Sequence, residues 1–494
     1  MSSAGRLDGL RWGMIPSIPR KSRMGLFDMA KKKRSEKDVI QSGRGVASLA
    51  EAKAWMAARG ITEIECAVPD LAGVGRGKIM PTSKFLSNPT MNLPLSVFFQ
   101  TISGEYPPYD GLVDSVVVDS DLVMEPDFST LTIVPWATDP TAQIIHDAYH
   151  RDGRPVELAP RQVLKNVMDL YAHKGWQAVI APEMEFYLVE PNTDPDYPLK
   201  PPVGRSGRPE IGRQSYSIQA VNEFDALFED MYDYSEAQGL EIDTLIHEDG
   251  AAQMEINLLH GDPLVLADQV FLFKRTIREA ALKHKIYATF MAKPTADEPG
   301  SAMHIHQSIV SAETGKNIFS DKEGDPTPEF FSFIAGQQRY LPTVMAILAP
   351  YVNSYRRLTR DSMAPINVQW GYDNRTAGLR IPPSSPAARR VENRVPSSDT
   401  NPYLVIAASL ACGYLGMVEG LRPTEPLEAD AKFLDFELPR GLLEAVAAMQ
   451  HSDEIATVLG PSFVKTYTAV KQTEFDTFMR VISPWEREYL LLNV

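Results

Sequence analysis

Two histidines stand at alternate positions in a short, mostly apolar run, the stretch GSAMHIHQS between Gly300 and Ser308. In a β-strand, His304 and His306 would leave the same face of a sheet, because successive side chains alternate. A lone histidine in such a run is more often a hydrogen-bonded core residue than a ligand. The pair becomes a candidate site only if other side chains with suitable chemistry reach the same face.

Glutamates repeat this pattern on other strand-like segments. In APEMEFYLVE, Glu183 and Glu185 alternate within an apolar run, and two carboxylates on one face repel unless they are protonated or bridged by cations. IHEDGAAQMEINLL contributes Glu248 and Glu255, and RRVENRVPSSDTNPY contributes Glu392. Carboxylate-rich ligation with imidazole suits Mg²⁺ or Mn²⁺ better than structural zinc. The segments therefore predict a site for divalent cations.

Arginines follow in turn-like contexts beside Gly and Pro: Arg356 and Arg357 in NSYRRL, Arg375 and Arg380 in NRTAGLRIP, and Arg390 and Arg394 around Glu392. Surface arginines are usually only solvated. Here they accompany a predicted metal site in a chain with no Walker P-loop and no GxGxxG. Metals that bridge phosphate oxygens and guanidiniums that neutralise the transferring group are the equipment for phosphoryl transfer to a carboxylate.

Composition narrows the class of protein. The 494 residues carry 44% hydrophobic and 23% charged residues, as soluble globular proteins do. A net charge of -15 argues against a general nucleic-acid binder. Two cysteines, Cys66 and Cys412, without a disulfide framework fit a reducing, cytoplasmic setting. The apolar run from Tyr403 reaches Glu419 early, so we expect a buried core helix and no membrane span.

The elements that must position these residues indicate an α+β protein. Residues 1–43 are rich in Lys and Arg and are expected to form a disordered extension. Residues 44–142 contain short β-runs, including a strand–turn–strand in ITEIECAVPDLAGVGRGKIM. Over residues 143–494, strands in twos and threes alternate with helices, which predicts a mainly antiparallel sheet with flanking helices.

Six segments together resemble the successive signatures of glutamine synthetases, in order and spacing: APEMEFYL, HEDGAAQMEINLL, GSAMHIHQS, NSYRRL, NRTAGLRIP and RRVENRVPSSDTNPYL. The resemblance covers the chain from about Val46 to the C-terminus. It implies a small N-terminal β-grasp domain, a large catalytic domain whose curved sheet forms a funnel, and a ring-shaped homo-oligomer, usually a dodecamer, with active sites between neighbouring subunits. ATP would phosphorylate the γ-carboxylate of L-glutamate, and a nitrogen nucleophile would then attack the acyl phosphate.

The resemblance also implies roles for individual residues. One metal would be held by Glu185, Glu248 and Glu255, and a second by Glu183, His304 and Glu392. ATP would be bound by His306, Ser308, Arg375, Arg380 and Arg390. Glutamate would meet Arg357 and Arg394, with Gly300 near its amino group. Arg375, Arg357 and Glu392 would act in catalysis.

Two departures from the family pattern bear on the nucleophile. Ammonia-using members have an acid in the small domain, matched here by Thr101, and an acid on a flap, matched here by Met363. Without both acids, the cage for a small cation is lost and a larger, less polar entrance remains. The resemblance is therefore to the glutamate–amine ligase branch, which includes γ-glutamylputrescine synthetases and shares the Pro-Asp-Leu and Arg-Gly-Lys pattern of VPDLAGVGRGKIMP.

We expect putrescine or another polyamine as the nucleophile. The alternatives are an ammonia-using enzyme whose acids stand at other positions, a ligase for a monoamine, and a non-catalytic assembly protein. Retention of all six metal-ligand candidates argues against the last, because a scaffold has little reason to keep so much buried charge.

Overall fold

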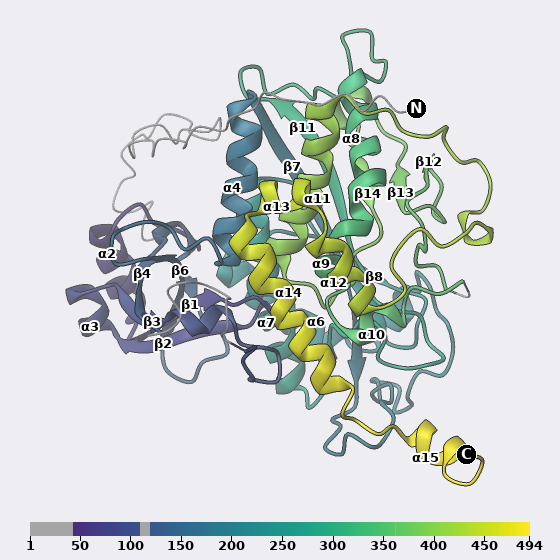
Figure 1. Cartoon of the computed structure of the whole chain (residues 1–494). Helices are drawn as coiled ribbons and strands as arrows, with labels where there is room; N and C mark the ends of the chain where they lie inside the picture. Colours follow the sequence, from purple (N-terminus) through teal and green to yellow (C-terminus); the bar gives the residue numbers. More distant parts are fainter. Residues whose placement is uncertain (1–42, 109–118, 361) are drawn as a thin grey trace.

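The computed structural model describes residues 43–108, 119–360 and 362–494, so the basic extension expected for residues 1–43 lies almost entirely outside the described ranges. Two sheets organise the chain, a six-stranded sheet in the small unit at the left of Figure 1 and an eight-stranded sheet in the large unit. This arrangement confirms the predicted α+β class.

The first sheet has the order β2-β1-β6-β4-β3, with β5 paired to β6. Its strands are β1 (Glu63–Pro69), β2 (Gly75–Pro81), β3 (Met91–Pro94), β4 (Asp121–Pro126), β5 (Thr132–Ile133) and β6 (Thr141–Tyr149). The predicted β1–β2 hairpin is present, and the Asp70 carboxylate closes its turn by accepting from the backbone N–H groups of Ala72 and Val74. Strand β6 runs across the expected boundary between residues 142 and 143 and pairs with β1 and β4.

The second sheet has the order β12-β13-β14-β11-β7-β9-β8, with β10 paired to β7. All its pairs are antiparallel except β12–β13. The strands are β7 (Trp176–Val189), β8 (Ile242–His247), β9 (Gln253–Leu258), β10 (Tyr287–Thr289), β11 (Met303–Ser311), β12 (Trp370–Tyr372), β13 (Leu379–Ile381) and β14 (Val391–Asn393). The central strand β7 thus lies between the strands that carry the two histidines and Glu255.

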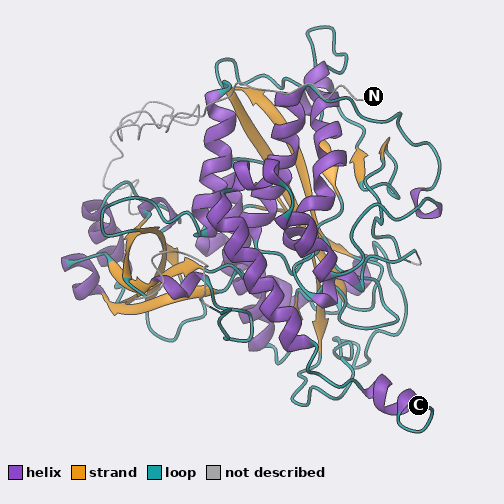
Figure 2. Cartoon of the chain, viewed as in Figure 1, coloured by secondary structure: helices purple, strands orange, loops and turns teal. Residues whose placement is uncertain are grey.

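Helices pack beside this sheet and around one another, as Figure 2 shows. They are α4 (Pro160–His173), α5 (Ile218–Asn222), α6 (Asp225–Gln238), α7 (Pro263–Lys283), α8 (Pro328–Tyr340), α9 (Met345–Leu348), α10 (Val352–Tyr355), α11 (Pro402–Glu419), α12 (Leu442–Gln450), α13 (Asp453–Leu459), α14 (Pro461–Phe478) and α15 (Pro484–Leu490); the small unit adds α2 (Leu49–Arg59) and α3 (Thr82–Ser87). The predicted occurrence of helices between the strands of residues 143–494 is confirmed, and α6 ends at Gly239 in the left-handed conformation.

Helix α11 is the predicted core helix. Within the described residues it is the one helix long and apolar enough to cross a membrane, but 78% of that stretch is buried in the structure. It packs against α8, α4 and α7. A helix that is apolar on all sides is also expected in the interior of a large protein core, which is the position that α11 occupies.

Candidate active site

Glu183 and the two histidines meet on one face of the second sheet. Glu183 on β7 lies directly opposite His304 on β11, and its Oε2 is 3.3 Å from His304 Nδ1. Its Oε1 is 2.7 Å from His306 Nε2. Both histidines are therefore turned toward one carboxylate, as the alternation of β11 predicts.

Two groups of side chains on this face could each hold a metal ion. Glu183, Glu255 and His304 form one group and Glu183, His306 and Glu392 the other, with the ligand atoms of each group within 4.8 Å of one another. The donors are carboxylate oxygens and imidazole nitrogens, which suit Mg²⁺ or Mn²⁺. In addition, Asn257 Oδ1, opposite Glu183, is buried without a hydrogen-bond partner among the described residues. The residues present therefore fit a divalent cation.

Burial, together with mutual repulsion, raises the pKa of three carboxyls on this face. Burial and the charge of Glu248 raise the pKa of Glu185 to about 8. Burial and the charges of Glu183, Glu185 and Glu248 raise the pKa of Glu255 well above its usual range. The pKa of Glu248 is raised by burial and by Glu183. A bound cation would relieve this repulsion, because opposite charge favours the ionised carboxylate.

The carboxyls beside cationic groups behave in the opposite way. Burial disfavours the charge of Glu183, yet its hydrogen bonds with His304 and His306 hold its pKa well below the usual range. Burial likewise opposes the charge of Glu392, but Arg394 and the two histidines lower its pKa. The pKa of His304 falls to about 4 through burial and the nearby Arg394. His304 therefore stays neutral at pH 7, as a metal ligand must be.

Three arginines surround Glu392 and His306. Arg394 donates to Glu392 at 2.5 Å and Arg380 donates to the same carboxylate at 2.8 Å. Arg390 Nε lies 3.2 Å from His306 Nδ1. Arg375 stands on the β12–β13 loop, is exposed, and forms no ion pair with any residue that the structure describes. The expected ATP-binding arginines thus cluster at the β13–β14 edge, with Arg375 at its periphery.

Arg357 and Gly300 lie against each other. Buried Arg357 donates to the carbonyls of Val395 and Arg394, and burial lowers its pKa to about 10 against the attraction of Glu185. A Cβ on Gly300 would stand 2.6 Å from Arg357 Cγ and 2.7 Å from the Ala292 carbonyl oxygen. Only glycine allows this approach, so the two residues expected at the glutamate subsite lie in direct contact.

Three other expected site residues lie apart from this centre or at its margin. The Thr101 hydroxyl is held in its own turn, where it accepts from the backbone N–H of Glu105. Met363 is 55% exposed, on the loop that follows Arg357. Ser308 shares the strand face of His304 and His306 on β11, paired with Val179. Among the described residues of one chain, the Thr101 hydroxyl interacts with Ser103 and Glu105 and not with the carboxylate centre.

Two residues absent from the sequence-based set complete the site. Gln253 donates from its side-chain amide to Glu185 Oε2 at 3.3 Å and to the Gly300 carbonyl at 3.1 Å. Asp373 accepts from Arg380 at 2.6 Å. The alternation of β9 could have identified Gln253, since it lies two residues before Glu255 and so shares its face. No comparable signal marks Asp373.

Known proteins share this architecture. The family model "Glutamine synthetase, catalytic domain" matches residues 157–490. The chain is 34% identical to the γ-glutamylputrescine synthetase PuuA of Escherichia coli (strain K12) over 91% of this chain and 96% of that protein. It is 34% identical to a glutamate–isopropylamine ligase of a Pseudomonas species, over 86% and 94%. It is 32% identical to the glutamine synthetase of Thermus thermophilus, over 81% and 92%.

Solved structures agree with these sequence similarities. The ligand-free structure of GmaS superimposes with a TM-score of 0.74 at 29% identity, covering 89% of this chain and 99% of that one. A GmaS–ADP complex gives the same TM-score at 28% identity. The matched domain, the relatives and the carboxylate–histidine face lead to one conclusion. The chain belongs to the glutamine synthetase family.

Proposed function

We propose that this protein joins the γ-carboxylate of L-glutamate to an organic amine, putrescine or another polyamine, with hydrolysis of ATP to ADP and phosphate. In the first step a γ-carboxylate oxygen attacks the terminal phosphorus of ATP and ADP leaves. In the second the amine nitrogen attacks the acyl phosphate, loses a proton, and phosphate leaves. Support comes from the names of two relatives, a γ-glutamylputrescine synthetase and a glutamate–isopropylamine ligase.

The carboxylate–histidine face serves the first step. As the resemblance implies, Glu185, Glu248 and Glu255 would hold one Mg²⁺ or Mn²⁺, and Glu183, His304 and Glu392 a second. The structure groups these residues differently, since Glu255 lies with Glu183 and His304, and Glu392 with Glu183 and His306. Bound divalent cations supply Lewis-acid stabilisation of phosphate oxygens. Neutral His304 leaves a lone pair available as a ligand, and the ionised Glu183 and Glu392 supply negative charge.

Arginines bind the two anionic substrates. Arg390, beside His306, and Arg380, beside Glu392, are placed to meet ATP phosphates, with Arg375 exposed for the same task. Arg394 keeps a buried Nε without a hydrogen-bond partner among the described residues, which makes it available to a glutamate carboxylate. Arg357 supports that subsite by holding the Arg394 and Val395 carbonyls.

The observation that carries the choice of an amine is the side chain at position 363. An exposed thioether stands where the resemblance expects a flap acid, and its Sδ lies 3.7 Å from Lys432 Nζ. An uncharged thioether beside a lysine does not attract the ammonium cation, and it cannot act as a base that accepts a proton from it. It can instead contact the alkyl chain of an amine.

A panel of nucleophiles tests the proposal. Phosphate release is measured with glutamate, ATP and Mg²⁺ or Mn²⁺ in the presence of putrescine, spermidine, isopropylamine or ammonium. The product is identified by mass. Higher kcat/KM for a polyamine than for ammonium is expected, and higher kcat/KM for ammonium than for every amine would refute it. Isopropylamine is included because one relative of equal identity carries that substrate in its name.

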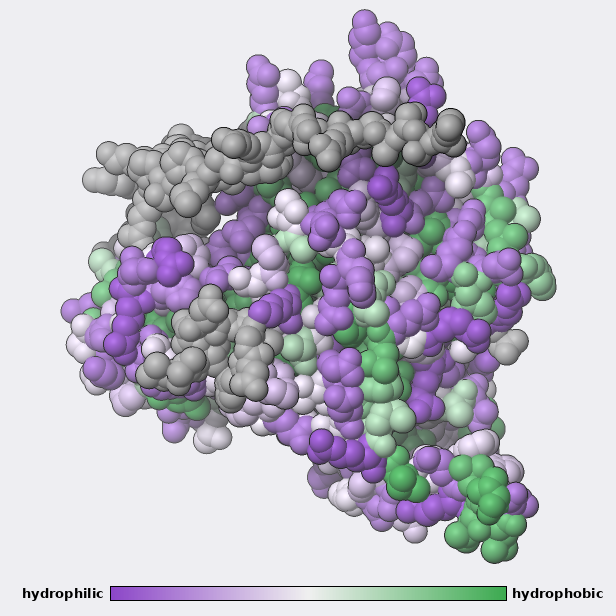
Figure 3. All heavy atoms as spheres, in the orientation of Figure 1, coloured by the Kyte–Doolittle hydropathy of each residue, from purple (hydrophilic) through white to green (hydrophobic). Residues whose placement is uncertain are grey.

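We further propose that copies of the chain associate into a homo-oligomer, a dodecamer as in the family resemblance. The segment after α14 exposes a run of apolar side chains, among them Val481, Ile482, Trp485 and Leu492. Figure 3 shows this green patch at the foot of the molecule, and Figure 1 shows α15 projecting from the body. Exposed apolar surface of this kind marks protein–protein contact.

The free, buried Cys66 and Cys412 support a reducing, cytoplasmic location.

A further inference from the structure

A cavity of about 730 Å³ lies where the β1–β2 hairpin docks on the large unit. The hairpin is held there by the Asn401 side chain, which donates to the Asp70 carbonyl at 2.8 Å, and by the packing of Gly75 near the Phe271 ring. Helix α7, the Phe290–Met291 segment and the Asp399–Thr400 segment form the other walls. None of the residues assigned above to metal, ATP or glutamate lines this cavity.

Positive charge predominates in its lining. Five lysine and arginine side chains face two carboxylates: Arg76, Lys78, Lys274, Arg275 and Arg278 against Glu65 and Asp399. Two of the cations are neutralised, since Arg76 pairs with Asp70 at 2.8 Å and Arg275 pairs with Glu65 at 3.0 Å. The three others have no carboxylate within ion-pair distance in the part of the chain that the structure describes.

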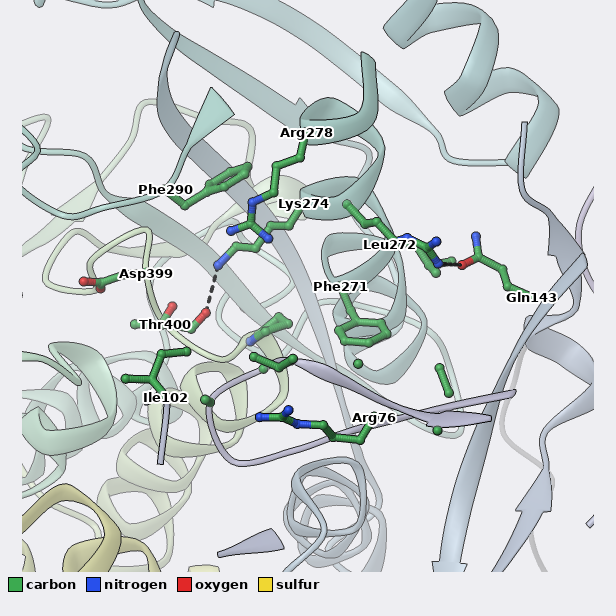
Figure 4. Close-up of a pocket in the computed structure, with 18 of the residues that line it drawn as sticks. Arg76, Ile102, Gln143, Phe271, Leu272, Lys274, Arg278, Phe290, Asp399 and Thr400 are labelled. Carbon is green, nitrogen blue, oxygen red and sulfur yellow. Dashed lines mark hydrogen bonds between the residues drawn. The ribbon is translucent and has the colours of Figure 1, made fainter. Parts of the chain in front are cut away.

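Two of these unpaired cations point into the same space. Lys274 and Arg278 stand four residues apart on α7 and so share one face of the helix. Figure 4 shows both side chains beside the Phe290 ring, and each cation lies 5.2 Å from the ring centroid. Lys274 Nζ donates to the carbonyls of Ser398 at 2.6 Å and Thr400 at 2.8 Å. Arg278 has no hydrogen-bond partner among the described residues.

Lys274 is half-buried and Arg278 is exposed, and the Lys274 ammonium loses its proton more readily here than in water. Burial and the neighbouring Arg278 lower the pKa of Lys274 to about 7, against the attraction of Asp399. Asp399 does not compensate it directly, because its Oδ2 accepts from Ser354 and its Oδ1 is buried without a partner among the described residues. Two cations that repel each other beside an aromatic wall are stabilised by an anionic group between them.

We propose that this cavity binds a small organic anion, whose carboxylate or phosphate group is held by Lys274 and Arg278 and whose apolar part packs on Phe290 and Met291. Carboxylate and phosphate share the chemistry that two cationic donors recognise. The aromatic and thioether side chains supply an apolar wall on the same side.

The test uses the full chain, free of metal and nucleotide, titrated calorimetrically with benzoate for the carboxylate source and phenyl phosphate for the phosphate source. Arg278→Gln is the test variant, because Arg278 has no protein hydrogen bond to lose. Lys283→Gln is the matched control, a lysine on the same helix paired with Asp230 outside the cavity. Arg390→Gln reports on anions bound at the active site.

For at least one of the two anions, Arg278→Gln is expected to weaken binding roughly tenfold or more, whereas Lys283→Gln and Arg390→Gln leave it unchanged. If Arg278→Gln weakens the binding of only one of the two anions, the carboxylate or phosphate group of that anion is the one that the cavity recognises. Unfolding of the unliganded Arg278→Gln protein at or above the wild-type temperature shows that the variant is folded. Absence of binding by both anions, or binding that responds only to Arg390→Gln, overturns the proposal; so does a neighbouring copy found filling the cavity.

Discussion

Glu183 on β7 and His304 on β11 face each other across an antiparallel pair, with 3.3 Å between Oε2 and Nδ1. On the other side of β7, Glu185 of the same strand lies opposite Glu255 of β9. The two pairs place potential ligands on both sides of β7. Glu183 of this central strand belongs to both groups of side chains that could hold a cation.

Removal of one carboxylate beside β7 is expected to weaken metal binding without destabilising the fold. Glu255→Gln is expected to weaken Mn²⁺ binding by at least about tenfold, measured by calorimetry on the metal-free protein. Its unfolding in the absence of metal should be unchanged or more resistant to denaturant, because the amide has no ionised form that burial and the neighbouring carboxylates oppose. Glu329→Gln, at an exposed position in the first turn of α8, is the control. Equal Mn²⁺ affinity in both variants would contradict the assignment.

Gly300→Ala tests the contact with Arg357. The new methyl group would stand 2.6 Å from Arg357 Cγ and 2.7 Å from the Ala292 carbonyl, so the segment or the arginine must move. We expect a loss of about 1–3 kcal/mol in the free energy of unfolding and a higher KM for glutamate. Gly441→Ala is the matched control, since a Cβ there meets nothing within 4 Å. Unchanged KM in Gly300→Ala would place the glutamate subsite elsewhere.

Lys274 predicts a pH dependence of stability. Its pKa falls from 10.5 to about 7 in the folded protein. Between these values the folded state binds fewer protons than the unfolded state, so the free energy of unfolding rises with pH, by at most about 1.4 kcal/mol per unit. Lys274→Met should lower stability through two lost hydrogen bonds and also remove this rise. Denaturant unfolding from pH 7 to pH 9.5 measures both slopes. An identical slope in the two proteins would contradict the prediction.

The strands and helices of the large unit could be predicted locally, whereas their pairing could not. Alternation marks β7 and β11 as strands with chemically active side chains on one face. That β7 lies between β11 and β9 depends on contacts far apart in the chain. The expectation of which residues share a metal site rests on the family resemblance, because spacing alone does not show which glutamate faces which histidine.

The limits of sequence reasoning are clearest at Gln253 and Arg278. Gln253 has no titratable group, so its residue type does not mark it as a site residue, although its side chain joins Glu185 to Gly300. Arg278 reads as an ordinary polar position on an amphipathic helix. Its significance depends on the hairpin and on Phe290, which only the tertiary structure brings beside it. Domain limits at 44–142 and 143–494 remain a proposal, and the pairing of β6 favours a boundary after Tyr149.

The C-terminal apolar segment predicts the effect of truncation on assembly. Removal of residues 479–494, which follow the end of α14, should reduce the mass of the particle measured by light scattering. The reason is that the exposed apolar side chains of this segment, which are proposed to contact another copy, are lost. Trp485→Ser should weaken assembly in the same direction. Ile211→Ser, at another exposed apolar side chain, is the control. A truncated protein with the mass of the full-length assembly would refute the role of the segment.

Met363→Glu tests the choice of nucleophile. A carboxylate at this exposed position would attract ammonium and accept its proton, and it would also place charge where the alkyl part of an amine is expected to pass. We expect the ratio of kcat/KM for ammonium to kcat/KM for the best amine to rise by about tenfold or more, which corresponds to about 1.4 kcal/mol of differential transition-state stabilisation. Met363→Gln is the matched control, since it has nearly the same shape without the charge. KM for ATP should stay constant in both variants. A ratio that does not change in Met363→Glu, or that changes equally in Met363→Gln, would show that the side chain at 363 does not select the nucleophile by charge.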